Sequence, residues 1–165
     1  MELSQTTLRG ILAQILSVNT AHVVPKQGNW YNPQDANANI ENWCGYRIKS
    51  NKPRTLPFYV EEKSKTNTVC VEKIADIELQ FVGPNAEEIA QSVAMWPLRG
   101  DVKAQFKTVN GAIMPDDLTA VSSIFVQDGA NTVTAWNVGV RVLWYSKLDT
   151  TQNIITNVDI GGKIN

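Results

Sequence analysis

The residue types that most often carry catalysis are sparse in this chain. His22 is the only histidine, and Cys44 and Cys70 are the only cysteines. A histidine beside a cysteine can act as base to a nucleophile, but no supporting motif accompanies His22 and Cys44. A single histidine also excludes a metal site built on several histidines. The sequence therefore predicts no catalytic residue and no metal-binding residue.

Paired acids and paired glycines do not change this prediction. The acidic pairs at residues 61–62 and 116–117 are sequence neighbours, and neighbours in a strand point to opposite faces. Surface carboxylates also need burial before they can work as an acid and a base. The glycines at 161–162 lack the strand and helix that flank a phosphate-binding loop. We expect a protein that is not an enzyme and binds no cofactor.

Length and composition indicate an ordinary globular domain. The 165 residues are 43% hydrophobic and 19% charged, which predicts one domain spanning residues 1–165. The formal net charge of −1 gives no overall attraction to nucleic acid or to a membrane surface. No run approaches the about 18 apolar residues of a membrane span. Glu2 and helically spaced apolar residues argue against a signal peptide, so we expect reduced cysteines.

The longest regular pattern is a strand, a corner and a helix between residues 69 and 97. Alternate positions from 69 to 81 are mostly apolar, which indicates a half-buried antiparallel strand. Gly83-Pro84 ends the strand, and Asn85 with Glu88 forms the pattern of a capping box. The helix should end at residues 95–96, because Pro97 restricts the residue before it. The apolar face of the strand and the apolar stripe of the helix are expected to pack together.

Other segments complete the predicted fold. An amphipathic helix is expected at residues 5–18, capped by Ser4, with Gly10 closely packed. Asp101 is expected to cap a short helix that carries Val102 and Phe106 and ends at residues 110–111. Strands are expected at residues 21–25, 43–49, 58–63, 121–127, 133–147 and 154–160. This order predicts an α+β domain: an antiparallel β-sheet with an N-terminal helix and one or two further helices packed on one side.

Charge is distributed unevenly along the predicted strands. Residues 47–65 are mainly basic, whereas residues 72–88 hold five acids against Lys73. Adjacent strands of opposite charge can stabilise each other through cross-strand pairs. Alternatively, the basic connector at residues 49–54 meets the acidic stretch of another subunit. The sequence leaves both interpretations open.

Aromatic residues mark the long polar loop at residues 29–43. Trp30, Tyr31 and Trp43 lie in a stretch rich in Asn, Gln, Gly and Pro that has no clear period. Long loops inside compact domains tend to be functional or disordered. The aromatic side chains favour a loop that packs on its own sheet or on a partner protein. As stacking platforms they also fit a different class of protein, a small glycan-binding module, which a glycan array would detect.

Taken together, the segments resemble the tail-terminator or neck-terminator proteins of tailed bacteriophages. The resemblance rests on the N-terminal amphipathic helix, Lys-Pro-Arg-Thr-Leu-Pro-Phe-Tyr at residues 52–59 and Gly-Pro-Asn-Ala-Glu-Glu-Ile-Ala at residues 83–90. It also rests on the late strand Trp-Asn-Val-Gly-Val-Arg-Val at residues 136–142, with its arginine, and on the closing strand at residues 154–160. The aromatic loop departs from that pattern.

The resemblance implies a structural virion protein of the tail or neck, made in the host cytoplasm. Such proteins usually form a ring of six copies at the head-proximal end of the tail. The implied partners are further copies of the chain, the tail tube protein and a neck or connector protein. DNA passes through the ring without sequence-specific contact, and no membrane is involved. A head-completion or connector protein of the same neck is the alternative. The expected interface residues are Trp30, Tyr31, Trp43, Lys49, Lys52, Arg54, Glu87 and Arg141.

Overall fold

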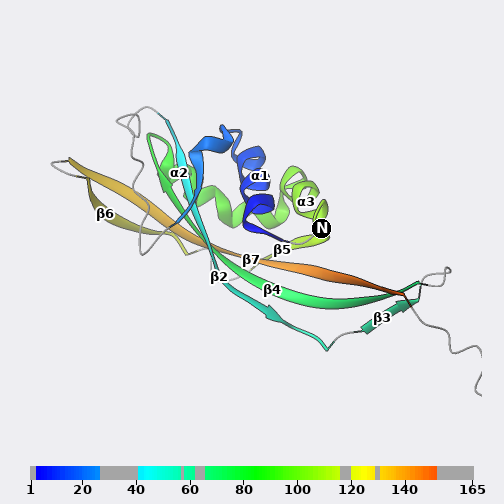
Figure 1. The fold of residues 1–165 in the computed structure, drawn as a ribbon. Coiled ribbons are helices and arrows are strands. Elements are labelled where there is room, and N and C mark those ends of the chain that lie inside the picture. The colour runs from blue at the N-terminus through cyan, green and yellow to red at the C-terminus, as the bar shows by residue number, and fades with distance from the viewer. Residues whose placement is uncertain are drawn as a thin grey trace, which may run out of the picture.

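The computed structural model describes residues 3–26, 41–56, 58–61, 66–115, 120–128 and 131–151. Within these residues seven strands form one sheet, and the helices lie on one side of it (Figure 1). The helical elements are α1 (Gln5–Leu16), η1 (Thr20–His22), α2 (Ala86–Ser92), η2 (Val93–Leu98) and α3 (Gly100–Lys107). The strands are β1 (Val23–Pro25), β2 (Trp43–Pro53), β3 (Phe58–Glu61), β4 (Thr66–Val82), β5 (Gly111–Met114), β6 (Ser122–Asp128) and β7 (Asn131–Thr151). The α+β prediction is confirmed, and the predicted closing strand at 154–160 lies outside the described residues.

Strands β4 and β7 form the spine of the sheet. They pair antiparallel from Thr66–Thr151 to Phe81–Trp136, and both run well past the helices (Figure 1). The strand order is β1-β2-β4-β7-β5, with β3 beside β4 and β6 beside β7. One pair departs from the antiparallel prediction, because β1 runs parallel to β2. A parallel pair needs a long crossover, and residues 26–42 supply that length.

The main core lies between the helices and the side of the sheet that they cover. Alternate residues of β4 and β7 point to this side, as the period of two predicts. The largest fully buried helical side chains are Trp96 and Phe106. The apolar residues of β4 pack with α2 and Val93, as expected, and Ile89 of α2 is partly buried at the edge of this core. The core residues of β4 and β7 are Ala75, Ile77, Leu79, Phe81, Val138, Val140, Val142 and Trp144.

Helix α1 confirms its predicted cap but not its predicted end. The Thr7 N–H donates a 3.1 Å hydrogen bond to Ser4 Oγ. Ser17 adopts a left-handed conformation with φ 54° and ends the helix after Leu16. The close packing expected at Gly10 is wrong, since no heavy atom lies within 4 Å of a Cβ built there.

The corner after β4 is held by a different contact from the predicted capping box. Asn85 has φ −112° and ψ 19°, and its side chain makes no cap bond. Instead, the Asn85 N–H donates a 2.9 Å hydrogen bond to Asn42 Oδ1, from the segment before β2. Gly83 has φ 131°, and a Cβ built on it would lie 2.5 Å from the Glu41 carbonyl oxygen. The backbone of residues 41–42 thus packs directly on the corner.

The chain stays helical beyond the predicted stop at residues 95–96. Helix α2 ends at Ser92, and the 3-10 helix η2 continues through Pro97 to Leu98. Val93 and Trp96 are three residues apart, and both are fully buried. A 3-10 turn places residues i and i+3 on one side, so burial of Trp96 outweighs the restriction imposed by Pro97.

Helix α3 is capped differently from the prediction. Asp101 lies inside the first turn, where its carboxylate pairs with Arg99, and it does not cap the helix. A carboxylate in the first turn is favoured by the helix dipole. Val102 and Phe106 lie on this helix, as predicted, and both are buried. Asn110 has φ 54° where the chain turns into β5.

Candidate interaction surface

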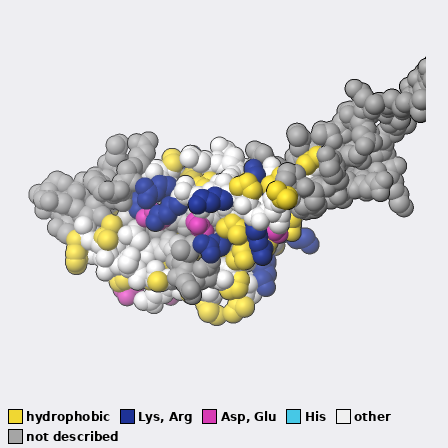
Figure 2. Space-filling view, turned by 90° about the horizontal axis from the view of Figure 1, so that it is seen from below, with side chains coloured by type: hydrophobic (Ala, Val, Ile, Leu, Met, Phe, Trp, Pro, Cys, Tyr) yellow, Lys and Arg dark blue, Asp and Glu magenta, His cyan; other side chains and the backbone are white. Residues whose placement is uncertain are grey.

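The side of the sheet that faces away from the helices carries a band of charged side chains (Figure 2). We call this side the uncovered face. On it, Asp76 of β4 lies between Ser50 of β2 and Arg141 of β7. Residues directly opposite in antiparallel strands share a face, so acids of β4 meet cations of both neighbours. Figure 2 shows the Lys and Arg side chains spread across this face with Asp and Glu between them.

Glu78 is the centre of the largest charge cluster. Lys26 Nζ and Arg47 Nη2 lie 2.7 Å from its two carboxylate oxygens, and Lys49 Nζ lies 3.1 Å away. Partial burial opposes ionisation of Glu78, but these three hydrogen bonds outweigh it and lower its pKa to about 2. The single carboxylate of Glu78 is therefore ionised at neutral pH and forms ion pairs with three positive side chains.

A β-bulge in β2 helps to build this surface. The register of β2 against β4 shifts between Ile48 and Ser50. The consecutive residues Lys49 and Ser50 consequently both reach the uncovered face, Lys49 to Glu78 and Ser50 to Asp76.

Two further acids of β4 are paired along the same face. Arg141 Nε donates a 2.6 Å hydrogen bond to Asp76 Oδ1, and this bond is the main cause of the lowered pKa of Asp76. Glu72 accepts a 3.3 Å hydrogen bond from the Tyr145 hydroxyl and lies 3.7 Å from Arg54. The cross-strand interpretation is thus confirmed for these acids, whose cations belong to the same chain.

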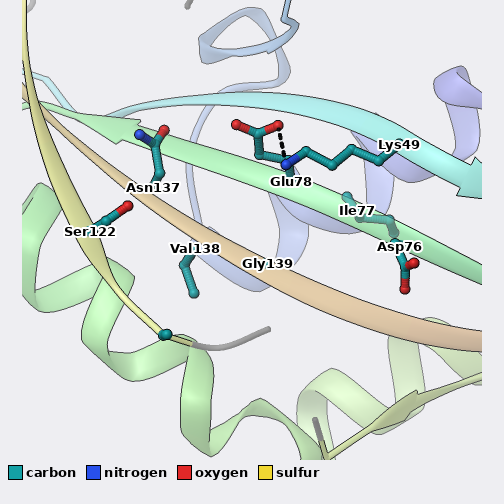
Figure 3. A pocket seen from close by; sticks show the side chains of 9 residues that line it. Lys49, Asp76, Ile77, Glu78, Ser122, Asn137, Val138 and Gly139 are labelled. Atoms are coloured by element: carbon teal, nitrogen blue, oxygen red, sulfur yellow. Dashed lines mark ion pairs between the residues drawn. The ribbon is translucent and has the colours of Figure 1, made fainter. Parts of the chain in front are cut away.

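A shallow hollow of about 350 Å³ lies beside the Glu78 cluster (Figure 3). Lys49, Asp76, Glu78, Ser122 and Asn137 contribute its polar groups. These offer an ammonium, two carboxylates, a hydroxyl and an amide, which suit hydrogen bonding to a polar surface. None of the described residues that line the hollow is a histidine or a cysteine.

The expected interface residues fall into separate places. Lys49, Lys52, Arg54 and Arg141 share the uncovered face, whereas Glu87 lies on α2, on the opposite side of the sheet. Trp43 is 8% exposed, and its ring stacks on His22 with centroids 4.4 Å apart. Little of the Trp43 ring therefore remains for a partner. Trp30 and Tyr31 lie outside the described residues.

Sequence reasoning missed several exposed apolar side chains. Leu56 follows β2 and is 87% exposed, Phe125 of β6 is 79% exposed, and Leu98 of η2 is 72% exposed, with Met95 near it. The only sequence signal at η2 is an apolar run, which reads equally well as core. Lys26 was missed as well, because its partner Glu78 is 52 residues away.

Cys44 and His22 are the two residues considered above as a nucleophile and its base. Burial raises the pKa of the Cys44 thiol, the reverse of what a nucleophile needs. His22 Nε2 lies 3.0 Å from Glu41 Oε2. In the part of the chain that the structure describes, no group of three or more His, Cys, Asp or Glu is arranged to hold a metal ion. No helix among the described residues is long and apolar enough to cross a membrane.

Comparison with known proteins gives the family. No curated protein matches the sequence. The family described as phage neck terminator protein matches residues 5–165, nearly the whole chain. That match includes α1, the charged strands and the corner after β4. The chain therefore belongs to the phage neck terminator proteins, a family of structural components of the virion neck.

Proposed function

We propose that the protein forms a closed ring, of six copies, at the head-proximal end of a phage tail. The ring joins the tail tube protein to a neck or connector protein, and DNA passes through its channel. Membership of the neck terminator family is the observation that carries this proposal. The protein acts by assembly, without a catalytic step, in keeping with its buried Cys44 thiol and its His22 held between Glu41 and Trp43.

The arrangement of the fold supports a ring. The described helices all lie on one side of the sheet, so each subunit presents two unlike sides (Figure 1). A ring subunit needs different surfaces for its neighbours and for the channel, and heterologous contacts between neighbours close into a ring when the rotation between them allows it.

Exposed apolar side chains supply candidate contacts. Met95 and Leu98 project from η2, and Phe125 projects from the separate strand β6. Clustered apolar residues at a surface often mark protein contacts, and they contribute more to affinity than exposed ion pairs do. We assign η2 to the contact between neighbouring subunits, with Glu87 at its rim. Trp30 and Tyr31 remain candidates for contact with a neighbour or with the tube.

Electron microscopy of particles assembled with and without the protein tests this function. We expect tails of abnormal length, or tails separated from heads, when the protein is absent. Normal tails joined to heads in its absence would rule out the terminator role. Normal tails that fail only to join heads would favour the alternative, a head-completion protein.

The contact at η2 is tested by Met95→Ser/Leu98→Ser in the same assembly. We expect particles assembled with this variant to lack the protein. The control variant Lys103→Ser/Lys107→Ser, on the exposed side of α3, should be incorporated into the particle. Equal incorporation of the two variants into the particle would show that η2 is not part of the contact between subunits.

A further inference from the structure

The uncovered face carries more positive than negative charge. Its described charged side chains on β2, β4 and β7, with the flanking Lys26 and Arg54, are six cations and three carboxylates. The cations are Lys26, Arg47, Lys49, Lys52, Arg54 and Arg141, and the carboxylates are Glu72, Asp76 and Glu78. The face thus has an excess of three positive charges, although the whole chain has a net charge of −1.

Three of the six cations lie further out than the acids they contact, whereas the Lys26 side chain is 1% exposed and the Arg141 side chain is about as exposed as that of Asp76. The side chains of Arg47, Lys49 and Arg54 are 37%, 54% and 48% exposed. The carboxylates of Glu72 and Glu78, which they contact, are 14% and 15% exposed. An approaching partner therefore meets guanidinium and ammonium groups, while the acids lie beneath and hold them in place.

The cations also form a line. Lys49 and Lys52 stand between Arg47 and Arg54, and the seven steps from residue 47 to residue 54 span about 23 Å at the rise of a β-strand. That length is about two-thirds of the roughly 34 Å turn of double-stranded DNA, which carries one negative charge for each about 1.7 Å of axis. An extended row of exposed cations fits an extended polyanion better than it fits a small ligand.

We propose that the uncovered face binds the phosphate backbone of double-stranded DNA without regard to sequence, and that it faces the channel. The second part rests on the proposed ring. Contacts of Lys and Arg to phosphates fix position and carry no sequence information, so the complex should be weak and sensitive to salt. Such contact lets a duplex slide along the surface, as passage through a channel requires.

Fluorescence anisotropy of the purified protein with a labelled 30-base-pair duplex tests the proposal. We compare wild type with Lys49→Gln/Lys52→Gln on the uncovered face and with Lys103→Gln/Lys107→Gln on α3. Both variants lose the same charge, but only the first alters the face. Each phosphate contact contributes about 0.9 to the slope of log affinity against log salt concentration. We expect the first variant to lower the slope by about 1.8, and the second to leave it unchanged. The single change Lys52→Gln, expected to lower the slope by about 0.9, replaces the first variant if that variant does not fold.

Three results would overturn the proposal. One is no binding by wild type at about 50 mM salt, where such contacts are strong. The second is an equal loss of slope in both variants, which would mean diffuse attraction. The third is unchanged DNA binding with loss of ring assembly in the Lys49→Gln/Lys52→Gln variant, which would make a second copy the partner of this face. Native mass spectrometry of the same samples distinguishes the proposed ring from the proposed DNA-binding face. A ring that does not bind DNA would contradict only the DNA-binding face. A monomer that binds DNA through this face would contradict only the ring.

Discussion

Arg141 of β7 and Asp76 of β4 face each other across the centre of the sheet, with Arg141 Nε donating a 2.6 Å hydrogen bond to Asp76 Oδ1. The two residues are 65 positions apart, and Ser50 of β2 adds a 2.8 Å hydrogen bond from the third strand. This contact joins β2, β4 and β7 on the uncovered face, whereas the hydrophobic core joins them on the other. The same charged groups therefore stabilise the sheet and form its exposed cationic surface.

The stability of the protein should depend on pH through Glu78. Its pKa of about 2 in the folded state is below its ordinary value of 4.5, so its stabilisation is complete above pH 4.5 and is lost as pH falls towards 2. Glu78→Gln should be less stable than wild type near neutral pH, and the difference should shrink at about pH 3. Urea denaturation of both proteins at the two pH values measures this. Glu87→Gln, at an exposed position on α2, serves as control. A difference for Glu78→Gln that stays constant over the acid range would contradict the ion-pair cluster.

Phe81 should contribute strongly to the core. Its side chain is 1% exposed, and Phe81→Ala should cost about 3–5 kcal/mol of unfolding free energy. Lys103→Ala, at an exposed position of α3, is the matched control for chemical denaturation, with an expected change within about 0.5 kcal/mol. Gln80, next to Phe81 in β4, is unsuitable as a surface control, because it is fully buried although the alternation places it on the polar face. Similar midpoints for the two variants would show that β4 is wrongly placed.

Replacing two glycines by alanine should change the stability of the protein in opposite directions. Gly10→Ala in α1 meets open space and should stabilise the protein by up to about 1 kcal/mol. Gly83→Ala combines positive φ with a Cβ 2.5 Å from the Glu41 carbonyl oxygen, and should cost at least about 1–3 kcal/mol. Thermal unfolding of the two variants measures the contrast. Equal shifts in melting temperature would contradict the packing of residues 41–42 on the corner.

The side chain that caps the corner should be Asn42 and not Asn85. Asn42→Ala leaves the Asn85 N–H without its acceptor and should cost about 1 kcal/mol. Asn85→Ala removes a side chain that makes no cap bond and should cost less. The denaturation midpoints of the two variants measure this difference. A larger loss of stability for Asn85→Ala than for Asn42→Ala would support the capping box instead.

The sequence predicts those parts of the fold that depend on local periodicity. Alternation locates β4 and β7 and assigns Ile77 and Val140 to one side of the sheet, since side-chain direction in a strand repeats every two residues. The helical period likewise locates α1, whereas the excess of cations beside a run of acids left cross-strand pairs as one of two interpretations.

Contacts between distant segments were not predictable in this way. The Asn42 cap is 43 residues from Asn85, and Lys26 reaches Glu78 through a parallel strand pair. Neither contact produces a repeating pattern of residue types in the sequence from which it could be predicted. The excess of cations on one face also becomes visible only when β2, β4 and β7 are placed side by side.

The most direct test of the proposed ring is a cryo-electron microscopy reconstruction of the head–tail junction of the particle. We predict a closed ring of six copies at the head-proximal end of the tail, in which the seven-stranded sheet is recognisable by β4 and β7 running past the helices. The uncovered face should line the channel. A single copy per particle, or placement of the chain away from the end of the tail, would contradict the account.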